Sequence, residues 1–178
     1  MKKALPVSGV GCPVSGGGQQ DSGFGSPHSA FCTPHSAILS AARAAAKSAY
    51  CPYSRFPVGA AVLAEDGRIF AGANVENASY GLTLCAERAA LAQAVNAGCR
   101  RFRALAVCAG SRTPATPCGA CRQMLAEFCA DSMPVLCAAL RGRAVIRTTV
   151  GRLLPHAFRL HNASGRARPL GRPLGTGK

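Results

Sequence analysis

The sequence predicts an α/β protein, a three-layer α/β/α sandwich in which a five-stranded mixed sheet lies between two layers of helices. Three observations point to this fold class. Two apolar runs meet across an Asp-Gly turn at residues 65–67, a pattern typical of an antiparallel hairpin. Helix-forming segments at residues 85–96 and 118–129 are each followed by another apolar run, as in helical crossovers. A final pair of apolar runs meets across a second turn at residues 141–143.

The first element is an alanine-rich helix at residues 36–49, with Ser36 as its candidate N-cap. Strands at residues 58–64 and 68–75 form the first hairpin, because both are short apolar runs bounded by turn residues. In the helix at residues 85–96, apolar side chains recur at the three- and four-residue spacing of one helix face.

The remaining elements are a strand at residues 104–108, a helix at 118–129, strands at 135–140 and 144–149, and a short helix at 150–154. Hairpins pair strands antiparallel and helical crossovers allow parallel pairing, so the sheet is mixed. We expect the ligand site at the carboxyl end of the central strands, where the helices at 85–96 and 118–129 begin.

The length and composition suit one folded domain. The chain has 178 residues, of which 48% are hydrophobic, enough to form a core. We expect the domain to span residues 36–158. Residues 1–35 are rich in Gly, Ser and Pro and residues 159–178 are basic, so we expect both segments to be disordered extensions.

The pattern of apolar residues and cysteines predicts a cytoplasmic protein. The run after Lys2 and Lys3 is too short and too broken for a secretory signal, and no apolar run reaches the length of a membrane span. Four of the ten cysteines, Cys99, Cys108, Cys129 and Cys137, lie in apolar segments and are predicted to be ordinary buried residues. Free buried thiols are typical of a reducing compartment.

The net charge of +14 is the one compositional feature that could indicate a nucleic-acid partner. Residues 37–158 contain fourteen basic and six acidic residues, so the excess is not confined to the ends. However, the arginines near residues 100–103 and 141–143 lie at predicted turns, where charge is usually solvated. The ten Phe and Tyr residues form no stacking ladder for single strands. We therefore expect no nucleic-acid partner.

Two short stretches carry the residues best suited to chemistry, Cys-Ala-Glu at 85–87 and Pro-Cys-Gly-Ala-Cys at 117–121. The three thiols of Cys85, Cys118 and Cys121 can bind a tetrahedral zinc and leave its fourth position to water, as in a catalytic site. Each cluster lies at the start of a predicted helix, where the helix dipole stabilises thiolates.

Glu87 is close enough to the first thiol to reach a water on the metal without binding the ion itself. A carboxylate in this position can move protons, so Glu87 is the candidate catalytic residue. A lone C-x-x-C pair is also typical of a redox pair or of half a structural zinc finger. The helix-forming sequence after each thiol favours the catalytic zinc.

The motifs and their order resemble a known family. Upstream of the two thiol stretches lie CPYSRFPVGAA at residues 51–61 and NVENASY at residues 74–80. This arrangement resembles the small homotetrameric zinc-dependent cytidine deaminases of the cytidine/deoxycytidylate deaminase superfamily, from about Ser36 to Phe158. The resemblance implies a cytidine deaminase-like fold and one Zn²⁺ per chain. It also implies hydrolysis of cytidine and deoxycytidine to uridine, deoxyuridine and ammonia in pyrimidine salvage.

The resemblance further implies the substrate contacts. It places Asn74 and Glu76 on the ribose, whose hydroxyls both donate and accept hydrogen bonds. Phe56 and Phe158 become aromatic walls around the pyrimidine. Phe158 and Tyr80 are implied to reach the site of a neighbouring subunit, so we expect a homotetramer with shared sites.

Ala86 is expected to contact the edge of the base through its backbone N–H. Arg88 is expected to donate hydrogen bonds to the ligand sulfurs, because zinc with three thiolates is anionic and needs electron density withdrawn to remain an effective acid. A charge on the helix surface is the alternative role for Arg88.

Two other functions stay open. The first is a related zinc deaminase that acts on another small aminopyrimidine compound, against which Asn74 and Glu76 in the ribose motif count. The second is a protein that binds or edits nucleic acid, which only the net charge suggests.

Overall fold

The computed structural model describes residues 34–160, and within them the chain forms five strands and four α-helices. The strands are β1 (Val58–Ala64), β2 (Ile69–Ala73), β3 (Phe102–Ala109), β4 (Pro134–Ala139) and β5 (Val145–Thr149). The helices are α1 (Pro34–Ala45), α2 (Ala86–Asn96), α3 (Gly119–Phe128) and α4 (Val150–Leu153), with 3₁₀ turns η1 (Ala46–Ser48) and η2 (Tyr80–Leu82). Of the expected extensions at residues 1–35 and 159–178, residues 1–33 and 161–178 lie outside the described residues. Residues 34–35 belong to α1 and not to an extension, and Arg159 binds the carbonyl of Ala126 and the carboxylate of Asp131.

Every helix and strand predicted within these residues is present, with small shifts at the ends. The first helix begins at Pro34, and its last predicted turn is the 3₁₀ turn η1. Strand β3 extends beyond the predicted range of 104–108 at both ends, where it pairs with β1 at Phe102 and with β1 and β4 at Ala109. The turn η2 and the isolated bridges that join Val75 to Tyr50 and Leu84 have no counterpart in the prediction.

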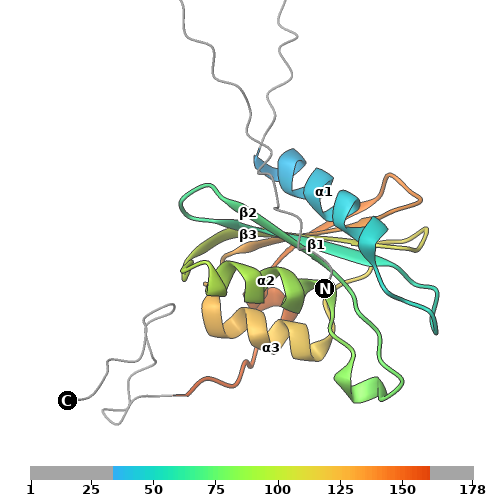
Figure 1. Ribbon diagram of the computed structural model, residues 1–178. Coiled ribbons are helices and arrows are strands. Elements are labelled where there is room, and N and C mark those ends of the chain that lie inside the picture. Colours follow the sequence, from blue (N-terminus) through green and yellow to red (C-terminus); the bar gives the residue numbers. More distant parts are fainter. Residues whose placement is uncertain (1–33, 161–178) are drawn as a thin grey trace, which may run out of the picture. The chain divides into compact units, whose positions relative to one another are not determined.

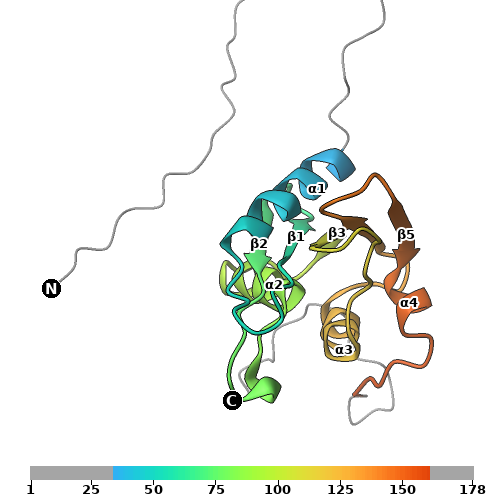
Figure 2. The same cartoon turned by 90° about the vertical axis from the view of Figure 1, so that its right-hand side faces the viewer.

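The sheet has the strand order β2-β1-β3-β4-β5. Its hairpins are antiparallel, β1 is also antiparallel to β3, and only β3 and β4 pair in parallel. Helix α1 covers one face, while α2 and α3 lie side by side on the other, as Figures 1 and 2 show. The predicted three-layer sandwich with a mixed sheet is therefore confirmed.

The core lies on both sides of the sheet. On one side Ile38 of α1 packs with Ala61 of β1, and on the other Leu91 of α2 and Leu125 of α3 pack with Val62. Successive residues of a strand point to opposite faces. A strand covered on both faces therefore appears in the sequence as a continuous apolar run, as β1 and residues 104–109 of β3 do.

A glycine in β2 lets α2 approach the sheet closely. A Cβ atom added at Gly72 would lie 2.6 Å from the amide nitrogen of Ala90 and 2.8 Å from the Cβ of Ala89. Contacts this short are not tolerated, so the helix would have to move. The small residue thus fixes the depth at which α2 rests on the sheet.

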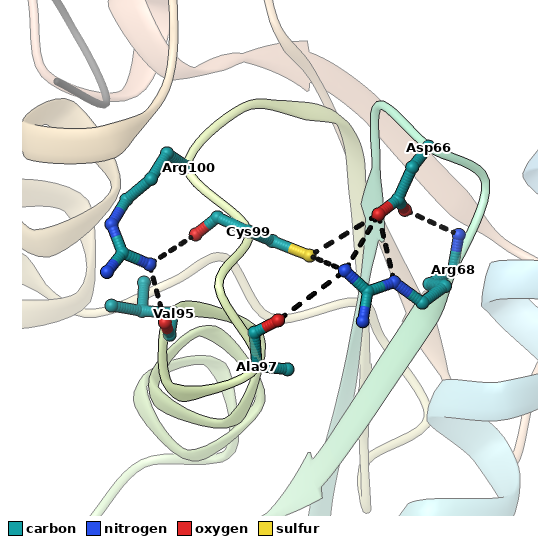
Figure 3. A network of polar contacts seen from close by, with 6 residues as sticks. All are labelled: Asp66, Arg68, Val95, Ala97, Cys99 and Arg100. Atoms are coloured by element: carbon teal, nitrogen blue, oxygen red, sulfur yellow. Dashed lines mark hydrogen bonds and ion pairs between the residues drawn. The ribbon is translucent and has the colours of Figure 1, made fainter.

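A polar network ties the carboxyl end of α2 to the turn of the first hairpin (Figure 3). It contains Asp66, Arg68, Val95, Ala97, Cys99 and Arg100. Arg100 donates to the carbonyls of Val95 and Cys99, and Arg68 donates to the Asp66 carboxylate at 2.9 Å and to the Cys99 sulfur at 3.1 Å. The carbonyl of Val95 also accepts from the amide of Gly98, so the two arginines add cationic donors at the negative end of the helix dipole. Arg100, expected as a solvated charge, is therefore partly buried and caps α2.

The eight cysteines within residues 34–160 are all free thiols. Cys99, Cys108, Cys129 and Cys137 are buried, as predicted. None of the helices in the described part of the chain is both long and apolar enough to cross a membrane.

We predict that Gly72→Ala lowers the free energy of unfolding by about 1–3 kcal/mol, because the new methyl group pushes α2 off the sheet. Denaturant unfolding measures this difference. Gly81→Ala is the matched control, since an added Cβ there meets nothing within 4 Å. Equal stability of the two variants would contradict the packing argument.

Candidate metal centre

Three cysteines from two helices bring their sulfur atoms together. Cys85 is the N-cap of α2, Cys118 is the N-cap of α3, and Cys121 lies in the first turn of α3. The sulfur of Cys118 is 3.7 Å from that of Cys85 and 3.5 Å from that of Cys121. All three sulfurs lie within 4.8 Å of one another, the only such cluster of possible metal ligands among residues 34–160.

The spacing of these sulfurs fits a zinc ion. Tetrahedral zinc with Zn–S bonds of about 2.3 Å holds its sulfur ligands about 3.8 Å apart. The observed separations are close to that value, so little movement is needed for the thiols to bind one ion. The N-termini of two helices, each with unpaired N–H groups, face the cluster and favour thiolate over thiol.

Arg88 lies beside the first thiol. Its guanidinium donates to the Cys85 sulfur at 3.8 Å and to the carbonyl of Thr83. A hydrogen bond from Cys121 is the largest influence on Cys85 and, with the bond from Arg88, lowers the pKa of Cys85 to about 5. The same shared proton raises the pKa of Cys121. The buried Nε of Arg88 has no hydrogen-bond partner within the described residues.

Glu87 is a buried carboxylate next to the thiols, with 6% of its surface exposed. Burial raises the pKa of Glu87, because removing the carboxylate from water penalises its charged form. An acid in this state binds a proton more readily than a surface glutamate does. Its position in the first turn of α2 directs it toward the same cavity as Cys85.

A cavity of about 180 Å³ adjoins the metal centre. Two of the thiols and four other predicted site residues line it: Cys85, Cys118, Phe56, Asn74, Ala86 and Glu87. Further lining comes from Val58, Thr83, Val107, Ala109, Ala115 and Thr116. Ala109 ends β3, so the cavity lies at the carboxyl end of a central strand, where the sequence predicts the ligand site.

Asn74 and Glu76 both hold the loop at residues 51–57. Asn74 accepts a hydrogen bond from the amide of Val58 at 2.8 Å and donates one to the carbonyl of Phe56 at 3.1 Å. Its amide keeps one N–H and one lone pair for a ligand. Glu76 is buried but does not line the cavity, because its carboxylate binds the backbone and hydroxyl of Ser54.

Ser54 connects Glu76 to the aromatic residue of the cavity. Its hydroxyl donates to the Glu76 carboxylate and accepts from the amide of Phe56 at 3.0 Å. The hydroxyl donation is the largest cause that lowers the pKa of Glu76, and backbone N–H groups of Ser54 and Tyr53 add to it. The loop therefore holds Phe56 through a charged anchor.

Two predicted aromatic residues do not reach this chain's own cavity. Tyr80 in η2 is 77% exposed and Phe158 is 70% exposed, and neither lines the cavity. The carbonyl of Phe158 accepts a hydrogen bond from Gln123 of α3 at 2.7 Å. Phe158 is thus tethered near α3 with its ring in solvent.

Several residues of the site escape sequence reasoning. Thr83, Ala115 and Thr116 line the cavity from loops, and Ser54 fixes the loop beside it. No periodicity or metal-ligand spacing marks them. The position of Thr116 just before Pro117 and Cys118 is the only local signal that the sequence offers.

Residues 33–137 match the family model described as the cytidine and deoxycytidylate deaminase zinc-binding region. The chain belongs to this deaminase family. A cytidine deaminase from Sporosarcina psychrophila is 54% identical over 121 residues, which cover 68% of this chain and 88% of that protein. One from Halalkalibacterium halodurans is 53% identical over 114 residues, covering 64% of this chain and 86% of that protein.

Solved structures agree with this family assignment. The crystal structure of cytidine deaminase from Burkholderia pseudomallei has a TM-score of 0.67 at 48% identity, covering 70% of this chain and 98% of that one. Cytidine deaminase from Mycobacterium tuberculosis has a TM-score of 0.61 at 43% identity, covering 71% of this chain and 98% of that one. Both the fold and the zinc-binding region of the deaminase family are therefore shared.

We predict that Ser54→Ala raises the pKa of Glu76, because it removes the strongest hydrogen bond to that carboxylate. A lowered carboxylate pKa stabilises the fold above the ordinary value of 4.5, and this contribution is lost as the pH falls through the folded pKa. The variant should therefore be less stable than the wild type at neutral pH, and the difference should shrink in acid.

Denaturant unfolding between neutral pH and about pH 3 measures this difference. Ser132→Ala, at an exposed serine in the loop before β4, is the control and should show no such pH dependence. A stability difference that is constant with pH would show that the Ser54 hydroxyl does not act through Glu76.

Proposed function

We propose that this chain hydrolyses cytidine and deoxycytidine to uridine and deoxyuridine with release of ammonia, as a cytidine deaminase of pyrimidine salvage. The observation that carries the proposal is the cavity itself, where three clustered thiols and a buried carboxylate adjoin Phe56 and Asn74. Membership of the deaminase family and the relatives named above support the same activity.

We assign one Zn²⁺ per chain to Cys85, Cys118 and Cys121. The separations of their sulfurs and the zinc-binding region of the family support this assignment. Bound there, zinc would supply a Lewis acid that lowers the pKa of water from 15.7 toward about 7. Arg88 beside the Cys85 sulfur withdraws electron density from the thiolates.

Glu87 moves the protons of the reaction. Its carboxylate takes a proton from the attacking water and delivers it to N3 of the cytosine ring as the C4–O bond forms. It then takes the remaining proton from the new C4 hydroxyl and delivers it to the amino group, so that the C4–N bond breaks, ammonia leaves and C4 becomes a carbonyl. Burial and the raised pKa support this role, because the group must hold a proton between the two transfers. A positioned carboxylate of this kind accelerates a reaction by about 10²–10⁴.

The remaining cavity residues orient the nucleoside. Asn74 offers its free N–H and lone pair to a ribose hydroxyl. Glu76 does not line the cavity of the single chain, so we assign it to the ribose through the loop at residues 51–57, which its carboxylate holds in place. Phe56 forms one wall of the base pocket. The backbone N–H of Ala86 contacts the base edge, which its place in the first turn of α2 supports, because amides there lack a partner within the helix.

We further propose a homotetramer in which neighbouring subunits complete each site. Large apolar side chains that a single chain leaves exposed support this: Tyr50, Tyr53, Tyr80, Leu82 and Phe158 are each more than half exposed. Tyr80 and Phe158 supply the missing contacts from neighbours. The free thiols of the described residues support action in the cytoplasm, a reducing compartment.

The wild-type protein should release ammonia from cytidine and deoxycytidine, and Glu87→Gln should keep its zinc while losing at least about a hundredfold in kcat, because an amide cannot accept the proton. Ammonia release is measured on a panel of substrates that contains cytidine, deoxycytidine, adenosine, cytosine, dCMP and a cytosine-containing oligonucleotide. Zinc content is measured by elemental analysis. Turnover of only the oligonucleotide, or substantial activity of Glu87→Gln, would contradict the proposal.

We predict that Phe158→Ala raises KM for cytidine at unchanged zinc content, because each site loses a wall donated by its neighbour. Refolding this variant together with Glu87→Gln subunits should restore activity, since some sites then combine an intact Glu87 with an intact Phe158. Each variant refolded alone should stay impaired. Leu160→Ala, at a nearby exposed apolar residue, is the matched control. An active monomer, or no complementation, would rule out shared sites.

A further inference from the structure

Arg122 follows the third thiol and uses all three nitrogens of its guanidinium. Its Nε donates to the carbonyl of Pro117 at 2.7 Å and its Nη2 to the hydroxyl of Thr116 at 3.0 Å. Its Nη1 donates to the carbonyl of Leu153 in α4 at 3.1 Å. One side chain of α3 therefore binds two segments that are far apart in the sequence.

The first of these segments leads directly into the metal centre. The carbonyl of Pro117 belongs to the same planar peptide unit as the amide nitrogen of Cys118. Fixing that carbonyl sets the orientation in which the chain enters Cys118, whose sulfur lies 3.5 Å from that of Cys121. The hydroxyl of Thr116, held by the same guanidinium, belongs to a residue that lines the cavity.

The second segment leads to Phe158. Leu153 ends α4, and the chain then runs along α3, where Gln123 binds the carbonyl of Phe158 and Arg159 binds the carbonyl of Ala126. Because Gln123 and Arg159 hold this segment as well, loss of the Arg122 contacts loosens it without releasing it. The position of the segment at residues 154–159 therefore does not depend on Arg122 alone.

We propose that Arg122 is a positioning residue of the metal centre. Its hydrogen bonds fix the segment at residues 116–118 relative to α3. They thereby set the position of the Cys118 sulfur relative to that of Cys121, and the position of Thr116 in the cavity wall. This inference rests on the proposed function, since it assigns a role within the same site.

The shape of the guanidinium, and not its charge, performs this role. Its acceptors are two carbonyls and one hydroxyl, all uncharged, and they lie in three directions. A planar fork with five N–H groups can serve all three at once, whereas the single ammonium of lysine cannot. Arg122→Lys thus keeps the charge and removes the geometry.

The test compares the full-length wild type with Arg122→Lys and Arg122→Gln. We expect both variants to lose zinc to a chelator about ten to a hundred times faster, the usual range for residues that orient metal ligands. We also expect a shifted visible spectrum after substitution with Co²⁺, which reports the arrangement of the thiolates, and a raised KM for cytidine. Arg152→Gln, at an exposed arginine of α4, is the matched control and should match the wild type.

Thr116→Val provides a second variant that keeps Arg122 and removes one acceptor. It should speed zinc loss less than Arg122→Lys does, and the double variant should be no worse than Arg122→Lys alone, because the two residues act through one bond. If the Arg122 variants do not fold, Thr116→Val alone tests the proposal: faster zinc loss than in the wild type supports it, and an unchanged rate contradicts it. Additive effects of the two substitutions would contradict the proposal.

Unchanged zinc release and an unchanged Co²⁺ spectrum, together with equal losses of Tm in the metal-free and metal-bound forms, would overturn the proposal in favour of a purely structural role. A wild type that holds zinc but deaminates nothing in the panel would contradict the proposed function alone. The rates of zinc release would then still decide the role of Arg122.

Discussion

The convergence of two helix N-termini on one point is the constraint on which the rest of this structure depends. Three sulfurs within 4.8 Å of one another repel as thiolates, so they need a cation and a scaffold that resists their separation. Helices α2 and α3 lie on the same face of the sheet and begin at the same end of it (Figure 1). That arrangement follows from the crossovers that place β3 between β1 and β4.

The position of α2 on the sheet is then set by a small residue beneath it and by charged residues at its carboxyl end. Gly72 lets α2 sink onto β2, while Arg68 and Arg100 bind its carboxyl end (Figure 3). Beside the cavity, the loop that carries Phe56 is held by hydrogen bonds that run through Ser54 to the buried Glu76 carboxylate. Several charged side chains, among them Arg100, Arg122 and Glu76, therefore bind backbone groups inside the fold.

Sequence reasoning predicts the sheet, the helices and the thiol cluster because each leaves a local pattern. The strands are apolar runs, α2 and α3 begin at their own cysteines, and a C-x-x-C spacing brings two ligands together within one turn. Ser54 leaves none, because its partner Glu76 lies 22 residues away and only the fold brings the two together. Thr83 and Arg122 have partners five or six residues away, but in irregular segments whose contacts follow no helical or strand period. Phe158 is exposed in the single chain, and its place at the site of a neighbouring subunit stays a prediction.

The single parallel pair in the sheet has a consequence for the order of folding. The strands β3 and β4 can pair only after the whole crossover that contains α3 has closed, and such non-local pairings form slowly. Cys85 belongs to the preceding crossover, so the three thiols meet only when both long connections are in place. A metal ion that binds these three thiols would therefore be captured late in folding, and it would stabilise a nearly complete fold instead of starting its formation.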